Sequence, residues 1–393
     1  MNNLNSKALE LHEKNRGKLA ISSKVQLENK YDLSLAYSPG VAAPCVEISK
    51  DKEKVYNYTS KGNMVAVITD GTAVLGLGNI GPEAALPVME GKCLLFKKFA
   101  DIDAIPICLN TTDTEEIIRT VKYLAPTFGG INLEDISFPR CVEIETRLKQ
   151  ELDIPVFHDD QNGTAIVTAA ALINACKLVN KNFEDITVAL SGLGAAGSSI
   201  AKLIKQMGIK TIYATNSRGI ITNKKDNHPE IQKLLEDKVI TSFDDYKEDS
   251  LFEIMKDADV FIGVSVADIV TSKMVNLMND KPIVFALANP NPEISYEEVQ
   301  KSKAYIYATG RSDIKNQINN VLAFPGIFRG ALDAKSKRVT KEMYEVTARA
   351  IANLISDEEL NSEYIIPSAF DSRVTHAVSK AVYEKVIELK INR

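Results

Sequence analysis

The chain has 393 residues, of which 45% are hydrophobic and 25% charged, and its formal net charge is −5. At roughly 100–200 residues per domain, this length predicts two or three domains with a large buried core. The acidic balance, with a pI near 5.6, excludes the basic surface that nucleic acids and anionic membranes require. We therefore expect neither as a partner.

Cysteine usage and the N-terminus indicate the compartment. The five cysteines form no CxxC pair (Cys45, Cys93, Cys108, Cys141 and Cys176). An odd number of scattered thiols is typical of a reduced protein. The N-terminus mixes charges without an apolar core, and no apolar run approaches the ~20 residues of a membrane span. We therefore expect a cytoplasmic protein with no signal or transit peptide.

The first part of the chain alternates strand-like and helix-like segments. Residues 1–25 are polar, with a helical stretch near 7–15 that we expect to form an arm over the body. Strands are expected at 64–70, 104–109 and 154–158, and helices at 84–100 and 114–126. The stretch GGIN (129–132) is expected to be a glycine-rich loop. This alternation predicts a parallel, doubly wound α/β sheet.

A second alternation begins at Ile186. Strands are expected at 187–190, 211–215, 260–264, 283–288 and 304–309, and closing helices at 340–356 and 372–390. In the last helix, valines recur at helical spacing behind Asp371, a candidate N-cap. We place a domain boundary near Gly163, dividing the chain into residues 1–162 and 163–393.

The pattern GxGxxG occurs twice. The copy Gly192-Leu193-Gly194-Ala195-Ala196-Gly197 follows an expected strand and opens an expected helix. That context suits a dinucleotide, whose diphosphate lies at a helix N-terminus. The copy at 76–81 is separated from its strand and is followed at once by Pro82, so we interpret it as a loop of the substrate domain. Residues 163–393 are therefore predicted to form a Rossmann-type dinucleotide-binding domain.

The end of the strand after the fingerprint bears on the choice of dinucleotide. An acid is expected there to hold the ribose hydroxyls, but this chain has Asn216, followed by Ser217 and Arg218. A neutral amide does not repel a 2′-phosphate, and Arg218 could pair with one. A solvated turn explains the same residues equally well. NAD and NADP both remain open, and we favour NAD.

Acidic pairs predict a metal site. Glu134-Asp135 precedes a helix expected near Pro139, and Asp159-Asp160 ends the strand IPVFH. The carboxyl ends of parallel strands are where such folds place their chemistry. Oxygen ligands without cysteine suit Mg²⁺ or Mn²⁺. A single acidic dyad is more often a helix cap, and His158 is more simply a packed side chain than a ligand.

Together the motifs resemble the malic enzyme family in its short bacterial form. The resemblance covers residues 15–390 and rests on highly specific motifs. These are LAYSPGVA (35–42), VITDGTAVLGLGNIGPEAALPVMEGK (67–92), INLEDISFPRC (131–141), VFHDDQNGTA (156–165), LSGLGAAG (190–197), ANPNPE (288–293) and NNVLAFPG (319–326). No phosphotransacetylase-like extension follows Arg393, so we expect the short form rather than the hybrid one.

The resemblance implies site residues and partners. It implies Tyr37 as general acid, Lys92 as general base and Asp159 as the group that orients Lys92. It implies Glu134, Asp135 and Asp160 as metal ligands, residues 192–197 as the pyrophosphate site, and Asn289 and Asn320 as substrate and nicotinamide contacts. Residues 1–162 would then be the malic-type substrate and metal domain, malate the substrate, and a homodimer the assembly.

One departure from the family concerns the substrate. Larger eukaryotic members carry an arginine just before their GLG loop that grips a malate carboxylate, and this chain has Ala73 there. Another group must hold that carboxylate.

The implied reaction is oxidative decarboxylation of malate to pyruvate and CO₂. A lysine base acts near neutral pH only if its pKa falls from about 10.4, and we expect burial and a neighbouring cation to lower the pKa of Lys92. Tyr37, with a pKa near 10, keeps its proton for donation to carbon.

Two other interpretations remain. A two-domain dehydrogenase of the amino-acid or tetrahydrofolate type would not decarboxylate and would need no metal. A non-catalytic dinucleotide sensor would be expected to lack the acid or the base.

Overall fold

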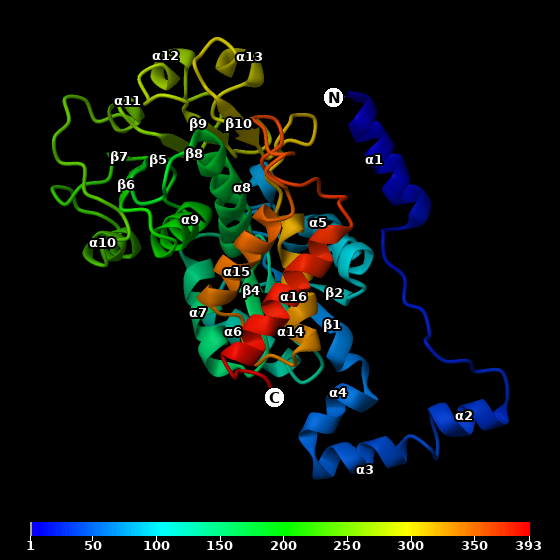
Figure 1. The fold of residues 1–393 in the computed structure, drawn as a ribbon. Coiled ribbons are helices and arrows are strands. Elements are labelled where there is room, and N and C mark those ends of the chain that lie inside the picture. The colour runs from blue at the N-terminus through cyan, green and yellow to red at the C-terminus, as the bar shows by residue number, and fades with distance from the viewer. Residues whose placement is uncertain (1) are drawn as a thin grey trace.

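The computed structural model describes residues 2–393 and contains one parallel and one mainly parallel sheet covered by helices, with an N-terminal segment outside them (Figure 1). That segment comprises α1 (Asn2–Asn15), α2 (Lys30–Ala36), α3 (Ala42–Lys50) and α4 (Val55–Tyr58). In Figure 1, α1, α2 and α3 lie away from the sheets. The helix expected near residues 7–15 is α1, and just after it Lys18 contacts α5 through Glu90 and Pro87. Helices α2 and α3, which follow, have no buried residue.

The first sheet has four parallel strands in the order β2-β1-β3-β4. They are β1 (Met64–Thr69), β2 (Asp103–Cys108), β3 (Gly130–Leu133) and β4 (Val156–His158). The helices of this part are α5 (Pro82–Ala100), α6 (Thr114–Leu124) and α7 (Arg140–Glu151). Since all four strands are parallel, the residues after Thr69, Leu133 and His158 meet at one edge.

Strand β3 corrects the sequence prediction of a loop at residues 129–132. Gly129 and Gly130 read as turn residues, but they allow the strand to approach its neighbours closely. A Cβ on Gly129 would lie 2.4 Å from the Lys61 carbonyl oxygen, and one on Gly130 would lie 2.9 Å from the Phe328 ring. The glycines therefore mark close backbone packing beside a fully buried strand.

The second sheet has the order β10-β9-β8-β5-β6-β7. Its strands are β5 (Thr187–Ser191), β6 (Thr211–Asn216), β7 (Gly219–Ile220), β8 (Val260–Gly263), β9 (Ile283–Ala286) and β10 (Ile306–Thr309). Only β7, which the sequence did not predict, pairs antiparallel. Strand β5 lies between β6 and β8, so the chain reverses direction across the sheet at β5, where open α/β sheets bind ligands.

The helices of this half vary widely in length. They are α8 (Thr164–Val179), α9 (Ala195–Gln206), α10 (Pro229–Glu236), α11 (Leu251–Met255), α12 (Ser272–Val275), α13 (Tyr296–Val299), α14 (Phe324–Asp333), α15 (Lys341–Ala352) and α16 (Arg373–Glu388). In α16, the valines at helical spacing are buried as expected. The N-cap is Ser372 rather than Asp371, whose carboxylate accepts the Arg373 amide instead.

The largest buried cluster joins both halves. Helix α14 packs on α5 through Phe96, whose ring centroid lies 4.8 Å from that of Phe324 and 5.3 Å from that of Phe328. The same cluster runs from Val65 to Val386. The halves are therefore held together by a shared core, and the boundary at 162/163 stays a prediction.

One helical segment, Asp159–Val179, is long and apolar enough to cross a membrane by length and composition. It corrects the expectation that no apolar run approaches the length of a membrane span; small residues, mostly alanines, supply much of its apolar character. In the protein 78% of its most apolar window is buried, and α8 packs against α9 and α15. These contacts identify α8 as a core helix.

Candidate active site

A lysine and several carboxylates meet at the carboxyl edge of the first sheet. Helix α5 carries Lys92, whose Nζ lies 2.7 Å from Glu134 Oε1 and 2.5 Å from Asp159 Oδ2. The same Nζ lies 4.4 Å from the centroid of the Phe324 ring. The Lys92 side chain is 11% exposed and that of Asp159 is fully buried. The amine is thus fixed between two acids, with little access to water.

Glu134, Asp135 and Asp160 form a second group beside this lysine. One carboxylate oxygen from each lies within 4.8 Å of the other two. The Asp135 amide donates to Asp160 Oδ2 at 2.7 Å, which holds the loops after β3 and β4 together. The donors are all hard oxygens, and with Asp159 the site places four carboxylates around one ammonium. That excess of negative charge fits a divalent cation such as Mg²⁺ or Mn²⁺.

The charges in this cluster shift one another's pKa values. Burial raises the pKa of Glu134 well above its usual range, and it also raises that of Asp159, while Lys92 opposes both. Burial by itself would lower the pKa of Lys92, but the carboxylates of Asp159 and Glu134 outweigh it and raise that pKa. The lowered pKa expected for Lys92 is therefore not found, because its two carboxylate partners favour the ammonium more than burial disfavours it.

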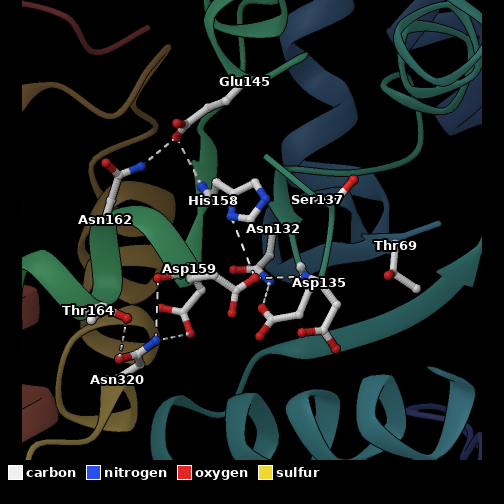
Figure 2. A network of polar contacts seen from close by, with 12 residues as sticks. Thr69, Asn132, Asp135, Ser137, Glu145, His158, Asp159, Asn162, Thr164 and Asn320 are labelled. Atoms are coloured by element: carbon white, nitrogen blue, oxygen red, sulfur yellow. Dashed lines mark hydrogen bonds and ion pairs between the residues drawn. The ribbon is translucent and has the colours of Figure 1, made fainter. Parts of the chain in front are cut away.

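Neighbouring side chains hold the two acids in place. Asn132 Nδ2 donates to Glu134 Oε2 at 2.9 Å, and Asn320 Nδ2 donates to Asp159 Oδ2 at 3.2 Å. Figure 2 shows Asn320 facing Asp159, with Thr164 Oγ1 donating to its Oδ1 at 3.2 Å. Asn320, predicted as a substrate contact, is thus a direct partner of Asp159.

Gly163 belongs to this site, although the sequence did not predict it. A Cβ on Gly163 would lie 1.9 Å from Asp159 Oδ1. The position of the Asp159 carboxylate therefore requires glycine in the DDQNG turn. The signal was the glycine itself, four residues after the acid.

Two further polar groups brace the edge and were also missed. Buried Glu145 of α7 accepts from the His158 amide at 3.0 Å and from Asn162 Nδ2 at 2.7 Å (Figure 2). Arg140 Nη1 lies 2.7 Å from Asp70 Oδ2, and its Nη2 donates to Thr72 Oγ1 at 2.9 Å. These contacts tie α7 to the loops that carry the acids.

The glycine fingerprint lies at a separate cavity. This cavity, of about 750 Å³, is lined by Gly192–Gly194 after β5, by Thr215–Ile221 and by Ser265. A Cβ on Gly197 would lie 1.8 Å from the Gly192 carbonyl oxygen, whereas one on Gly194 meets nothing within 4 Å. Gly197 thus allows α9 to start close to the turn, and Gly194 leaves the space in front of the α9 N-terminus open. Ala195 and Ala196 form the first turn of α9.

At the far end of this cavity, β6 ends in Asn216, whose Oδ1 accepts the Arg218 amide at 2.8 Å. Ser217, Arg218 and Lys225 line the same cavity. Lys225 forms an ion pair with Asp249. The end of β6 therefore offers amide, hydroxyl and cationic groups. Of the two acids that line the cavity, Asp226 and Asp249, the second is paired with Lys225.

Asn289, predicted as a substrate and nicotinamide contact, lies beside the loop that follows β1. It follows β9, is exposed, and its carbonyl oxygen would lie 2.9 Å from a Cβ on Gly76. The loop containing the other glycine pattern (76–81) connects β1 to α5 and contacts the turn at Asn289. This placement agrees with its interpretation as a loop of the first half.

Tyr37, predicted as the general acid, is not brought to the cluster. It is the C-cap of α2 and is 68% exposed. Helix α2 lies outside the body, far from α5 in Figure 1. Among the described residues, residues 25–50 form hydrogen bonds and ion pairs only with residues 23–54, so none of these contacts holds Tyr37 near Lys92.

One sheet carries a lysine surrounded by carboxylates, and the other is a Rossmann-type sheet with a glycine-rich turn. Together they are the arrangement of a dinucleotide-dependent oxidoreductase with two halves. The family models named "Malic enzyme, N-terminal domain" and "Malic enzyme, NAD binding domain" match residues 15–149 and 161–390. The chain belongs to the malic enzyme family, whose reaction is the oxidative decarboxylation of malate.

Individual relatives span most of the chain. It is 55% identical over 99% of its length to a bifunctional malic/malolactic enzyme of Bacillus subtilis, covering 95% of that protein. It is 52% identical over 96% of its length to an NAD-dependent malic enzyme of Geobacillus stearothermophilus, covering 78% of that protein. The crystal structure of malic enzyme from Pyrococcus horikoshii matches with a TM-score of 0.92 and 46% identity, covering 99% of this chain and 92% of that one. Other relatives are named NADP-dependent malic enzymes.

Proposed function

We propose that this chain oxidises and decarboxylates malate with Lys92 as general base, Tyr37 as general acid and a divalent metal at Glu134, Asp135 and Asp160. The observation that carries the assignment is the contact of Lys92 Nζ with Glu134 and Asp159 beside the acidic trio. The amine therefore borders the place where a substrate oxygen held by a cation would lie.

The side chains then have separate tasks. Unprotonated Lys92 takes the proton of the malate C2 hydroxyl, while a nicotinamide, when bound, accepts the hydride from C2. Asp159, held by Asn320, keeps the amine pointed at that oxygen. The resulting β-keto acid loses CO₂, and Tyr37 protonates C3 of the enolate to give pyruvate. Each proton transfer contributes typically ~10²–10⁴-fold to the rate.

A cation at the acidic trio would supply Lewis-acid stabilisation of the negative charge that develops on the substrate. The chain's own contribution is to fix the three carboxylates. The Asp135 amide holds Asp160, and Asn132 holds Glu134. The fit rests on the oxygen donors and on the excess of acids around Lys92.

For the dinucleotide we propose that both NAD and NADP bind, with NAD preferred. The diphosphate would lie at the α9 N-terminus above Gly194, and the adenosine ribose near Asn216. Asn216 does not repel a 2′-phosphate, and Arg218 lies beside it. The preference for NAD is supported by the relative named NAD-dependent at 52% identity. A cytoplasmic location remains a prediction from composition.

The test is the initial rate with malate and Mn²⁺, following reduced dinucleotide and pyruvate together, with NAD and NADP compared. We expect equal amounts of both products and loss of activity in EDTA that Mn²⁺ restores. Reduced dinucleotide without pyruvate, or activity that survives EDTA, would instead indicate a non-decarboxylating dehydrogenase. Dinucleotide binding without turnover would indicate a sensor.

A further inference from the structure

Residues 25–50, with α2 and α3, form an outer arm that exposes apolar side chains a folded chain normally buries. More than half of the large hydrophobic residues exposed in the part of the chain described lie between Leu4 and Tyr58. On the arm, Tyr31 is 70% exposed, Leu35 59% and Tyr37 68%. An exposed apolar surface of this kind marks an interface.

The arm also leaves and rejoins the body at the edge opposite the active site. On one side, Lys24 Nζ binds Asp103 Oδ2 at 2.7 Å, and Asp103 is the first residue of β2. On the other, Lys61 Nζ donates to the carbonyl oxygens of Ala125 and Phe128, both at 2.7 Å, just before β3 begins. Both attachments lie at the amino ends of strands, whereas Lys92 meets its acids at the carboxyl ends.

The lengths of the elements show how far the attachment points of the arm lie from Lys92. A six-residue strand such as β1 is about 20 Å long, and α3 reaches only about 14 Å. Helix α3 runs outward from α4 rather than back along the sheet, and α2 continues beyond it (Figure 1). Tyr37 is therefore held away from Lys92 of the same chain, whereas Lys92 and its carboxylates are already in contact.

We propose that Tyr37 acts in the active site of a second copy of this chain. Each site of the dimer then combines Lys92 and the carboxylates of one protomer with the partner's Tyr37. The exchange is reciprocal, as a two-fold axis requires, and it covers the apolar face of both arms. The inference rests on the proposed role of Tyr37 as general acid, and it makes the dimer a condition of catalysis.

The decisive experiment uses heterodimers of two differently tagged chains, purified over both tags. The first pairs a Tyr37→Phe chain with a Lys92→Ala chain. With exchanged arms, one site carries both lesions and the other carries none, so about half of wild-type malate oxidation per dimer returns. If each Tyr37 served its own chain, every site would carry a lesion and activity would stay at the level of the two homodimers.

The second heterodimer reverses the expectation. It pairs a wild-type chain with a Tyr37→Phe/Lys92→Ala double variant. With exchanged arms both sites are damaged and activity is lost, whereas sites confined to one chain would keep about half of it. Tyr123→Phe, at an exposed tyrosine of α6 outside the arm and the site, is the matched control and should leave activity unchanged. Failure of the proposed function is recognised separately, because the wild-type homodimer would then make no pyruvate from malate.

Discussion

Tyr37 divides the reaction into two halves that can be measured apart. Tyr37→Phe keeps the ring and deletes only the donor, so folding and dinucleotide affinity should barely change. Reduction of oxaloacetate by NADH forms no enolate and should remain measurable. Tautomerisation of pyruvate passes through the enolate and should fall by ~10²-fold or more. Equal losses in both partial reactions would make Tyr37 a substrate-positioning residue.

The acidic trio predicts a metal requirement that depends on charge. Asp160→Asn and Glu134→Gln each remove a charged oxygen with little change in volume. We expect the Mn²⁺ concentration for half activation to rise at least about tenfold, a loss of ~1.4 kcal/mol. Calorimetric Mn²⁺ binding should weaken in parallel, while Asp153→Asn, at an exposed position outside the trio, serves as the control. Unchanged Mn²⁺ affinity in both variants would refute the trio as the metal site.

Asn216 predicts how the dinucleotide is chosen. Asn216→Asp places a carboxylate at the end of β6, where it would bind ribose hydroxyls and repel a 2′-phosphate. The KM for NADP should rise by about tenfold or more, with the KM for NAD unchanged or lower. Asn223→Asp adds the same charge at an exposed position beyond the residues that line the cavity. Parallel shifts for both dinucleotides in Asn216→Asp would contradict the assignment.

Among the residues, the sequence predicted those whose chemistry is rare. Lys92, Glu134 and Asp159 stand in motifs that carry reactive groups, and the structure brings them within contact distance. Gly163 and Asn132 were missed because their role is to give room or a hydrogen bond to another residue. Such a role depends on neighbours that no local pattern names.

At the scale of the element, substitutions of the two fingerprint glycines Gly197 and Gly194 should have different effects. Gly197→Ala puts a methyl group against the Gly192 carbonyl at the start of α9, so stability should fall by about 1–3 kcal/mol. Gly194→Ala meets no protein atom within 4 Å, so the fold should persist while the KM for the dinucleotide rises. Thermal unfolding and initial rates separate the two effects. A fully stable Gly197→Ala chain would contradict the close-packing role.

Helices and strands were predicted correctly where an apolar pattern extends over several turns. The prediction failed where glycines fit both a turn and a closely packed strand. Helices α5, α6 and α16 lie within a few residues of their expected bounds, because each has an apolar face over several turns. Strand β3 has four residues and was taken for a loop, because its two leading glycines resemble a turn. Only the close approach of Lys61 and Phe328 explains them.

The whole molecule joins two sheets through one core, and its N-terminal arm stays apart. The alternation of strands and helices predicted both sheets, since each unit is local in sequence. The position of Tyr37 was not predictable in this way, because it depends on where the arm is anchored. No local sequence pattern shows that Tyr37 lies away from Lys92 of the same chain.

The central claim is that catalysis depends on Lys92 between Glu134 and Asp159. The most direct measurement is kcat for malate oxidation with Mn²⁺ in Lys92→Ala, beside Lys98→Ala on the same helix. Lys92→Ala should lose at least ~10²-fold in kcat while its NADH affinity is retained, and Lys98→Ala should match the wild type. A Lys92→Ala enzyme keeping more than about a tenth of wild-type kcat, a barrier change under ~1.4 kcal/mol, would contradict the account.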